Sequence, residues 1–182
     1  KALKTKNITP EDITDIILTH LHFDHVGGIG TKNGELVFKN ATIHVHKKHL
    51  EYSQNATLKD QGSFHTKHFL PLLDKYKELG RLNLLDELEG EILNDENESI
   101  NFKASFGHTP YMIHPYNNEY IYMADLVPMR HHVHIPWVMG YDIEPAVTTT
   151  YKQKFYDFIS EKNLSMIFEH DNETVSSTLI KG

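Results

Sequence analysis

The feature that constrains this chain most is a run of metal-ligand side chains directly after a short apolar segment. Residues 20–25 read His-Leu-His-Phe-Asp-His and follow the apolar residues 16–18. Imidazole and carboxylate groups are the usual protein ligands of zinc and related divalent metals. The first two histidines are two positions apart and point the same way on extended backbone, whereas the last two residues follow a turn. The run therefore predicts a metal site at the end of a buried strand.

The composition suits a soluble domain with its own core. The chain has 182 residues, 39% apolar and 24% charged, so residues 1–182 are expected to form a single domain. The absence of cysteine excludes a thiolate zinc site and a cysteine nucleophile. A net charge of −7 argues against a nucleic-acid partner, and no apolar run reaches the length of a membrane span. No signal peptide is visible, which favours a cytoplasmic location, although the start at Lys1 leaves an upstream one open.

Periodicity and turn signals predict a mixed α/β (α+β) domain in layers. Strands are expected at residues 13–19, 41–46, 100–106, 111–116, 120–124 and 164–168. Helices are expected at residues 47–55, 69–79 and 146–161, and an irregular aromatic loop at 128–145. The pair Asn117-Asn118 between two of the strands is a hairpin signal.

Further candidate ligands stand at the ends of predicted strands. His108, Asp125 and His170 each follow one of these strands by one or two residues, at the end where a sheet presents a site. Together with the first run they make a set too large for one tetrahedral zinc but suited to two metals that share a carboxylate. The complete set is His20, His22, Asp24, His25, His108, Asp125 and His170.

In this order the motifs resemble the metallo-β-lactamase superfamily. Residues 20–25 match the His-x-His-x-Asp-His signature of the superfamily. The later motifs of the superfamily are matched by Gly107-His108-Thr109-Pro110, Ala124-Asp125-Leu126 and Glu169-His170-Asp171. The long gap before the second motif and the segment 138–142 resemble the branch of quorum-quenching lactonases and methyl-parathion-hydrolase-like enzymes. Four motifs in the right order make the resemblance specific.

The resemblance implies an αββα sandwich and two divalent metal ions, with zinc expected. One ion would be held by His20, His22 and His108, and the other by Asp24, His25 and His170, with Asp125 bridging. The implied reaction is hydrolysis of a small-molecule lactone or ester, most simply the opening of an N-acyl homoserine lactone by a metal-bridging hydroxide. Asp125 and Asp24 would be the catalytic carboxylates, and Asp24 would protonate the leaving group. Glu169 and Asp171 are candidates to orient imidazoles by proximity in sequence only.

The chain differs from the family pattern in two places. Tyr111 stands where the family usually has glycine. Few residues precede the His-rich run, where the family has its first strands, so we expect an N-terminally truncated domain that lacks them. Exposed sheet surface would then favour a homo-oligomer.

The loop at 128–141 is expected to form a pocket wall for an acyl chain or aromatic leaving group. The predicted substrate contacts are Trp137, Met139, Tyr141 and Tyr111. The histidines of this loop are expected to be solvated because the ligand set is already full. His44, His46 and His49 form a weaker alternative cluster, since no acid or glycine loop accompanies them.

Three other readings stay open. A phosphotriesterase-like hydrolase would use the same metals with a different pocket. A metal-binding fragment without catalytic activity is the alternative that is not an enzyme. A redox diiron protein is a further alternative, because it needs the same ligand types. The bound metal distinguishes them in part, because zinc favours hydrolysis and iron favours redox chemistry. A β-lactamase or a glyoxalase-II-type thioesterase fits the ligand pattern and gap lengths less well.

Overall fold

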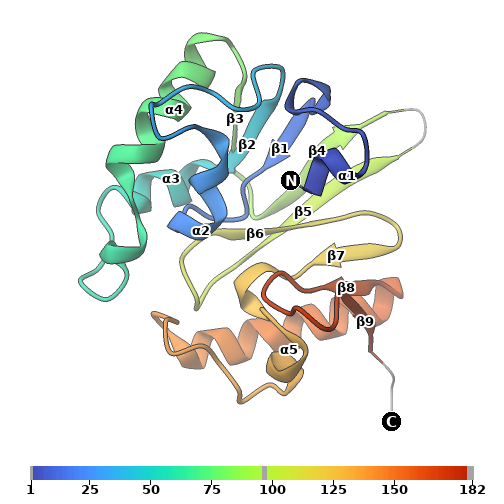
Figure 1. Ribbon diagram of the computed structural model, residues 1–182. Helices are drawn as coiled ribbons and strands as arrows, with labels where there is room; N and C mark the ends of the chain where they lie inside the picture. Colours follow the sequence, from blue (N-terminus) through green and yellow to red (C-terminus); the bar gives the residue numbers. More distant parts are fainter. Residues whose placement is uncertain (1, 96–97, 180–182) are drawn as a thin grey trace. The chain divides into compact units, whose positions relative to one another are not determined.

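The computed structural model describes residues 2–95 and 98–179 and divides into two compact units. The N-terminal unit is Lys1–Asp86 and the C-terminal unit is Glu87–Gly182. Each unit consists of one sheet with helices (Figure 1). None of the helices in the described part of the chain combines the length and apolar character that a membrane span requires.

The N-terminal unit is built on a three-stranded parallel sheet in the order β1-β2-β3. Its strands are β1 (Asp15–Ile17), β2 (Thr42–His46) and β3 (Leu82–Leu85). Its main helices are α3 (Lys47–Ser53) and α4 (Thr66–Glu78), with the short α1 (Ala2–Thr5) and α2 (Phe23–Val26). Buried residues of α4 at helical spacing, among them Phe69 and Leu73, pack with Ile43 and Val45 of the central strand. This burial of one helix face holds α4 against the sheet.

The C-terminal unit contains a six-stranded sheet in the order β4 to β9. The strands are β4 (Glu89–Asn94), β5 (Ser99–Ser105), β6 (Met112–Tyr116), β7 (Tyr120–Tyr122), β8 (Ser165–Ile167) and β9 (Ser176–Thr178). All neighbours are antiparallel except β7 and β8, which are parallel. Consequently β5, β7 and β8 run in the same direction, and their carboxyl ends lie at one edge of the sheet.

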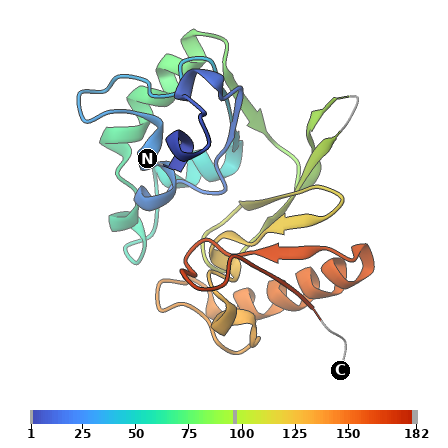
Figure 2. The same ribbon diagram turned by 45° about the vertical axis from the view of Figure 1, so that its right-hand side comes forward.

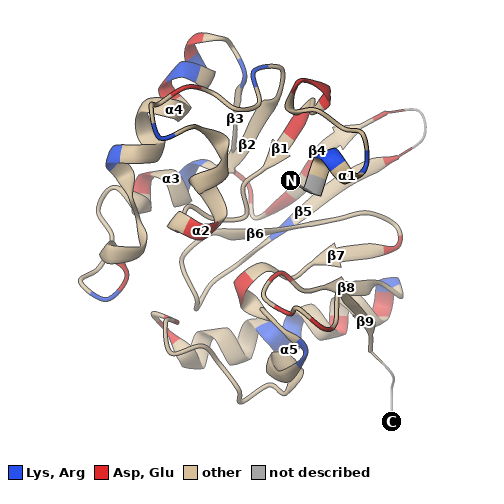
Figure 3. Ribbon diagram, in the orientation of Figure 1, with Lys and Arg blue, Asp and Glu red and all other residues tan. Residues whose placement is uncertain are grey.

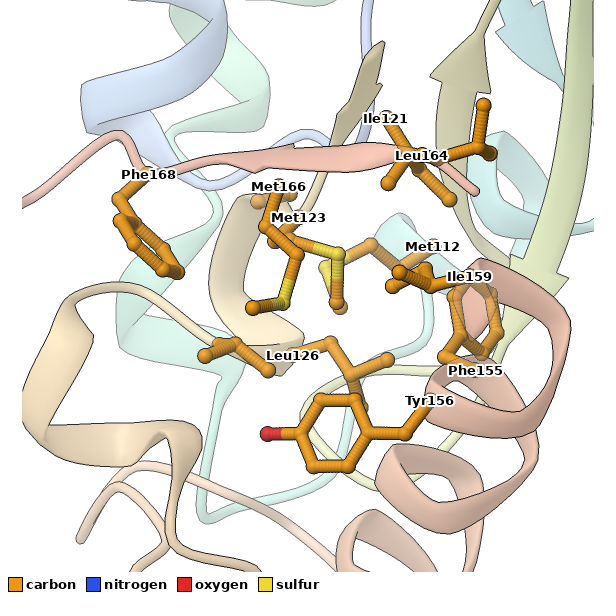
Figure 4. Close-up of a cluster of buried hydrophobic side chains, with 12 residues drawn as sticks. Met112, Ile121, Met123, Leu126, Phe155, Tyr156, Ile159, Leu164, Met166 and Phe168 are labelled. Atoms are coloured by element: carbon orange, nitrogen blue, oxygen red, sulfur yellow. The ribbon is translucent and has the colours of Figure 1, made fainter. Parts of the chain in front are cut away.

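Helix α5 (Pro145–Lys162) lies along this sheet, as the orange ribbon in Figure 2 shows. Phe155, Tyr156 and Ile159 of α5 belong to a buried cluster with residues of the sheet such as Met112 and Met166 (Figure 4). Both signs of charge occur on α4 and on α5 (Figure 3).

The predicted mixture of strands and helices is confirmed, and the elements agree closely with the expected ranges. The hairpin at Asn117-Asn118 joins β6 to β7, and Asn117 Oδ1 accepts the Tyr120 N–H at 2.8 Å. The strands β3, β4 and β9 and the short helices α1 and α2 were not predicted. Four short 3-10 turns of three residues lie at Pro10–Asp12, Gly27–Ile29, Gln61–Ser63 and Ala124–Leu126, and a fifth of four residues at Arg130–Val133.

Candidate metal centre

The first four predicted ligands lie together after β1 in the N-terminal unit. We call His20, His22, Asp24 and His25 the N-terminal ligand group. The ring centroids of His20 and His25 are 3.9 Å apart, and those of His20 and His22 are 4.6 Å apart. Three imidazoles are therefore gathered at the carboxyl end of a parallel strand.

The backbone of this group differs from the expected strand and glycine loop. β1 already ends at Ile17, and Asp24 and His25 lie within the short helix α2, which begins directly after His22. Asp24 Oδ2 is 3.6 Å from His25 Nε2, and the Asp24 side chain is 41% exposed. The carboxylate and the last imidazole of the group therefore lie close together at the start of α2.

A buried histidine of the weaker alternative cluster supports this group. His49 of α3 is fully buried, and its Nε2 accepts a hydrogen bond of 2.9 Å from the backbone N–H of Leu21, between the first two ligands. Thr19 Oγ1 lies 3.1 Å from Nδ1 of His20. The contact from His49 spans 28 residues, so no local pattern could have indicated it.

The other three predicted ligands meet in the C-terminal unit. His108 lies in the connection after β5, Asp125 follows β7 and His170 follows β8, all at the edge where these strands end. His108 Nε2 is 3.1 Å from Asp125 Oδ2, and His170 Nε2 is 3.1 Å from Asp125 Oδ1. Each oxygen of one buried carboxylate thus faces one imidazole. We call these three residues the C-terminal ligand group.

Asp142 was not predicted to have a role in the site, yet it contacts a ligand. Its Oδ1 accepts a hydrogen bond of 2.9 Å from Nδ1 of His108, and both side chains are 1% exposed. Burial opposes protonation of His108, but the hydrogen bonds to Asp125 and Asp142 outweigh it and raise the pKa of His108 to about 9. A carboxylate behind a ligating imidazole fixes the tautomer and the ring orientation. Asp142 is therefore placed to orient the His108 ring, as proximity in sequence had suggested for Glu169 and Asp171.

Asp171 instead holds the loop that carries His170. Its carboxylate accepts backbone N–H groups of Arg130 at 2.9 Å and Thr174 at 2.8 Å. The bond from Arg130 is the main cause that lowers the pKa of Asp171. The His170 N–H in turn donates to the Pro128 carbonyl at 2.9 Å. Asp171 thus acts on the loop backbone.

A close backbone approach fixes the His108 loop. Gly107 has φ +114, and a Cβ at this position would lie 2.4 Å from the backbone N of Thr148 in α5. The Gly107 carbonyl accepts the N–H of Glu144 at 2.8 Å, just before α5 begins. Only glycine combines this φ with this packing without strain.

The predicted substrate contacts lie in the C-terminal unit, and two of them are clearly exposed. Trp137 is 56% exposed and Tyr141 73% exposed, whereas Met139 and Tyr111 are partly buried. Tyr111 has φ 58, and its ring centroid is 4.7 Å from that of Phe106. Their contact with a substrate stays a prediction.

The remaining histidines of the weak alternative cluster have structural partners. His44 Nε2 is 2.8 Å from Asp15 Oδ1, and His44 Nδ1 accepts from Asn83 at 3.0 Å. His46 precedes α3 and accepts the Lys48 N–H at 3.2 Å. These contacts fit hydrogen-bonded core histidines better than metal ligands.

Both ligand groups fit divalent metal ions by donor chemistry and by spacing. In the C-terminal unit, Asp125, Glu169 and His170 each offer one atom within 4.8 Å of the others, and His20 and His22 do so in the N-terminal unit. Two ligands bonded to one zinc at about 2.0–2.2 Å lie within such a distance of each other. The groups are therefore of the type and spacing that hold a metal.

Comparison with known proteins decides the family. The family model of the metallo-beta-lactamase superfamily matches residues 1–170. The chain belongs to this superfamily. One curated relative is a probable metallo-hydrolase of Methanocaldococcus jannaschii. It is 36% identical to this chain over 55 residues, which are 30% of this chain and 24% of the relative.

Solved structures show the same fold. A probable metal-dependent hydrolase from Staphylococcus aureus aligns with a TM-score of 0.80 and 22% identity, over 97% of this chain and 61% of its own length. The dizinc quorum-quenching lactonase AidC aligns with a TM-score of 0.73 and 22% identity, over 100% of this chain and 68% of its own. The predicted metallo-β-lactamase-like fold is thus confirmed, and the chain spans about three fifths of the first of these proteins.

Proposed function

We propose that this superfamily member is a dinuclear metal-dependent hydrolase that opens lactone rings of the N-acyl homoserine lactone type. The observation that carries the proposal is the C-terminal ligand group, where both oxygens of Asp125 face imidazoles at 3.1 Å. The lactone substrate is supported by the quorum-quenching lactonases among the solved structures of the same fold.

We propose the same division of ligands that the family pattern implies. His20, His22 and His108 would hold one ion, and Asp24, His25 and His170 the other, with Asp125 shared. When bound, two such ions, with zinc expected, activate water at neutral pH and polarise the substrate carbonyl.

The chain's own residues supply orientation and a proton. Asp142 keeps the proton of His108 on Nδ1, so that Nε2 is the atom directed toward Asp125. Asp24 is 41% exposed beside His25, and we propose that its carboxylate takes up the proton released by the attacking water and passes it to the leaving alkoxide. Trp137, Met139, Tyr141 and Tyr111 are the proposed contacts of the acyl chain.

The test is a hydrolysis assay on the zinc-loaded protein with an N-acyl homoserine lactone and a chromogenic phosphotriester. Ring opening produces a carboxylic acid and can be followed by proton release. We expect lactone hydrolysis that Asp125→Asn abolishes. Asp142→Asn should lower metal affinity or activity by about 10- to 100-fold because it removes the group that orients a ligand.

The matched control is Asp157→Asn, an exposed carboxylate on α5 that contacts Gln153, which should leave the rate unchanged. If the protein cleaves only the phosphotriester, the lactone proposal is wrong and the protein is a phosphotriesterase-like hydrolase. Bound zinc without hydrolysis of either compound would favour a non-catalytic metal-binding protein.

A further inference from the structure

Helix α5 carries a lysine at a fully buried position. The exposed fraction of Lys152 is 0%, although a buried ammonium is costly unless its donors are satisfied. Lys152 Nζ donates to the carbonyl oxygens of His134 at 2.9 Å, Ile135 at 3.2 Å and Trp137 at 2.8 Å. Three donors meet three acceptors, which is the full capacity of the group.

The three carbonyls belong to one turn of the aromatic loop. The Trp137 N–H donates to the His134 carbonyl at 3.0 Å and closes the turn through Ile135 and Pro136. Carbonyls that converge in this way need a cation or several donors, since buried carbonyls are rarely left unbonded. Lys152 therefore determines the conformation of this turn.

A second side chain of the same helix face holds the residue before the turn. The Tyr156 hydroxyl donates to the Val133 carbonyl at 2.7 Å, four positions after Lys152 and hence on the same side of α5. Further along the loop, the Asp142 N–H donates to the Met139 carbonyl at 3.1 Å, and the Asp142 carboxylate binds His108. The loop is thus fixed to α5 at one end and to a metal-ligand candidate at the other.

The turn presents an aromatic side chain. Trp137 is 56% exposed, and its ring centroid is 5.5 Å from that of His134 in an edge-on contact. A fixed backbone with an exposed indole is suited to contact an apolar group of a substrate.

We propose that Lys152 is a positioning residue for substrate selectivity, which clamps the His134–Trp137 turn and so places Trp137 against the acyl chain. The acyl-chain part of this inference rests on the proposed lactonase function. The clamp itself does not, and it can be measured without any substrate.

Trp137 is the single tryptophan of the chain, so its fluorescence reports on the turn alone. Lys152→Met keeps most of the side-chain volume and removes all three donors. We expect stronger acrylamide quenching and emission at longer wavelength than in the wild type. Tyr156→Phe removes the neighbouring bond and should give a smaller change in the same direction; it also carries the test if Lys152→Met does not fold.

Lys154→Met is the matched control. Lys154 lies on the same helix but is exposed, with its Nζ 4.7 Å from the ring centroid of Tyr151. Its loss should leave the Trp137 fluorescence unchanged. A folded Lys152→Met protein with wild-type quenching would overturn the clamp.

The kinetic readout separates positioning from chemistry. With a long-chain acyl lactone, Lys152→Met should raise KM by about tenfold, because the acyl chain loses its apolar contact with Trp137, with kcat little changed. An unchanged KM, or an equal rise in Lys154→Met, would overturn the selectivity role. If the wild type opens no lactone, the proposed function and the selectivity role both fail, while the fluorescence result still decides the clamp.

Discussion

At Tyr111 the residue type conflicts with the backbone conformation. Its φ of 58 lies in the left-handed region, which costs a non-glycine residue about 1–2 kcal/mol. The family usually has glycine at this position, and the structure gives the reason. Here the contact of the Tyr111 ring with Phe106 at 4.7 Å offsets part of the strain.

This conflict predicts an inverted order of stability for two small substitutions. Both Tyr111→Ala and Tyr111→Gly lose the ring contact, but only glycine adopts this φ freely. We therefore expect Tyr111→Gly to have a free energy of unfolding about 1 kcal/mol above that of Tyr111→Ala in urea titrations. The usual order, with alanine more stable, would show that the left-handed conformation is absent in solution.

His114 should make stability depend on pH. Burial lowers its pKa to about 3, and its Nδ1 donates to the Tyr122 carbonyl at 3.2 Å, while its Nε2 accepts from Ser105 at 2.7 Å. The unfolded chain takes up a proton near pH 6.5 and the folded chain does not. The contribution of His114 to the free energy of unfolding is therefore complete above pH 6.5. It is lost by at most about 1.4 kcal/mol per pH unit as the pH falls toward 3.

The variant His114→Gln can form the same two hydrogen bonds and does not titrate. Its unfolding free energy should fall less steeply than that of the wild type between pH 6.5 and the acid limit of folding. Parallel slopes in the two proteins would contradict a neutral buried His114.

At the scale of elements, the ends of strands and the start of α5 position the C-terminal ligand group. Gly107 lets the His108 loop approach Thr148 closely. Gly107→Ala should lower the free energy of unfolding by about 2–4 kcal/mol, because an unfavourable φ and a steric clash add. The control Gly62→Ala has nothing within 4 Å of the new Cβ and should change stability by less than about 0.5 kcal/mol. Equal effects in denaturant titrations would refute the close approach.

The elements that sequence patterns predicted are those with a buried face. Helix α4 has its apolar residues at helical spacing, and β5 alternates toward the core. In contrast, β3 exposes Leu84, and β4 is largely exposed and carries charge and Gly90. Neither shows a period of two, so pairing with a neighbouring strand, which no local pattern reveals, makes them strands.

The residues of the candidate site likewise differ in whether a local sequence pattern reveals them. All seven ligand candidates follow from local motifs because strand ends and ligand types are both visible in the sequence. The supporting residues are not visible, since Asp142 contacts His108 across 34 residues and His49 contacts Leu21 across 28. Lys152 looks like an ordinary helix lysine until its three carbonyl partners are seen.

At the scale of the whole molecule, the ligand candidates are distributed over both compact units. The N-terminal unit provides three imidazoles and one carboxylate, and the C-terminal unit provides one carboxylate and two imidazoles. A dinuclear centre of the proposed kind needs both groups, and metal binding would then stabilise the folded protein by mass action.

The most direct test is the metal content per chain after purification without added metal and after dialysis against zinc. The account predicts two zinc-like ions per chain in the wild type, and a loss of metal in Asp125→Asn but not in the exposed control Asp157→Asn. One ion or fewer per wild-type chain after zinc loading would contradict the dinuclear centre.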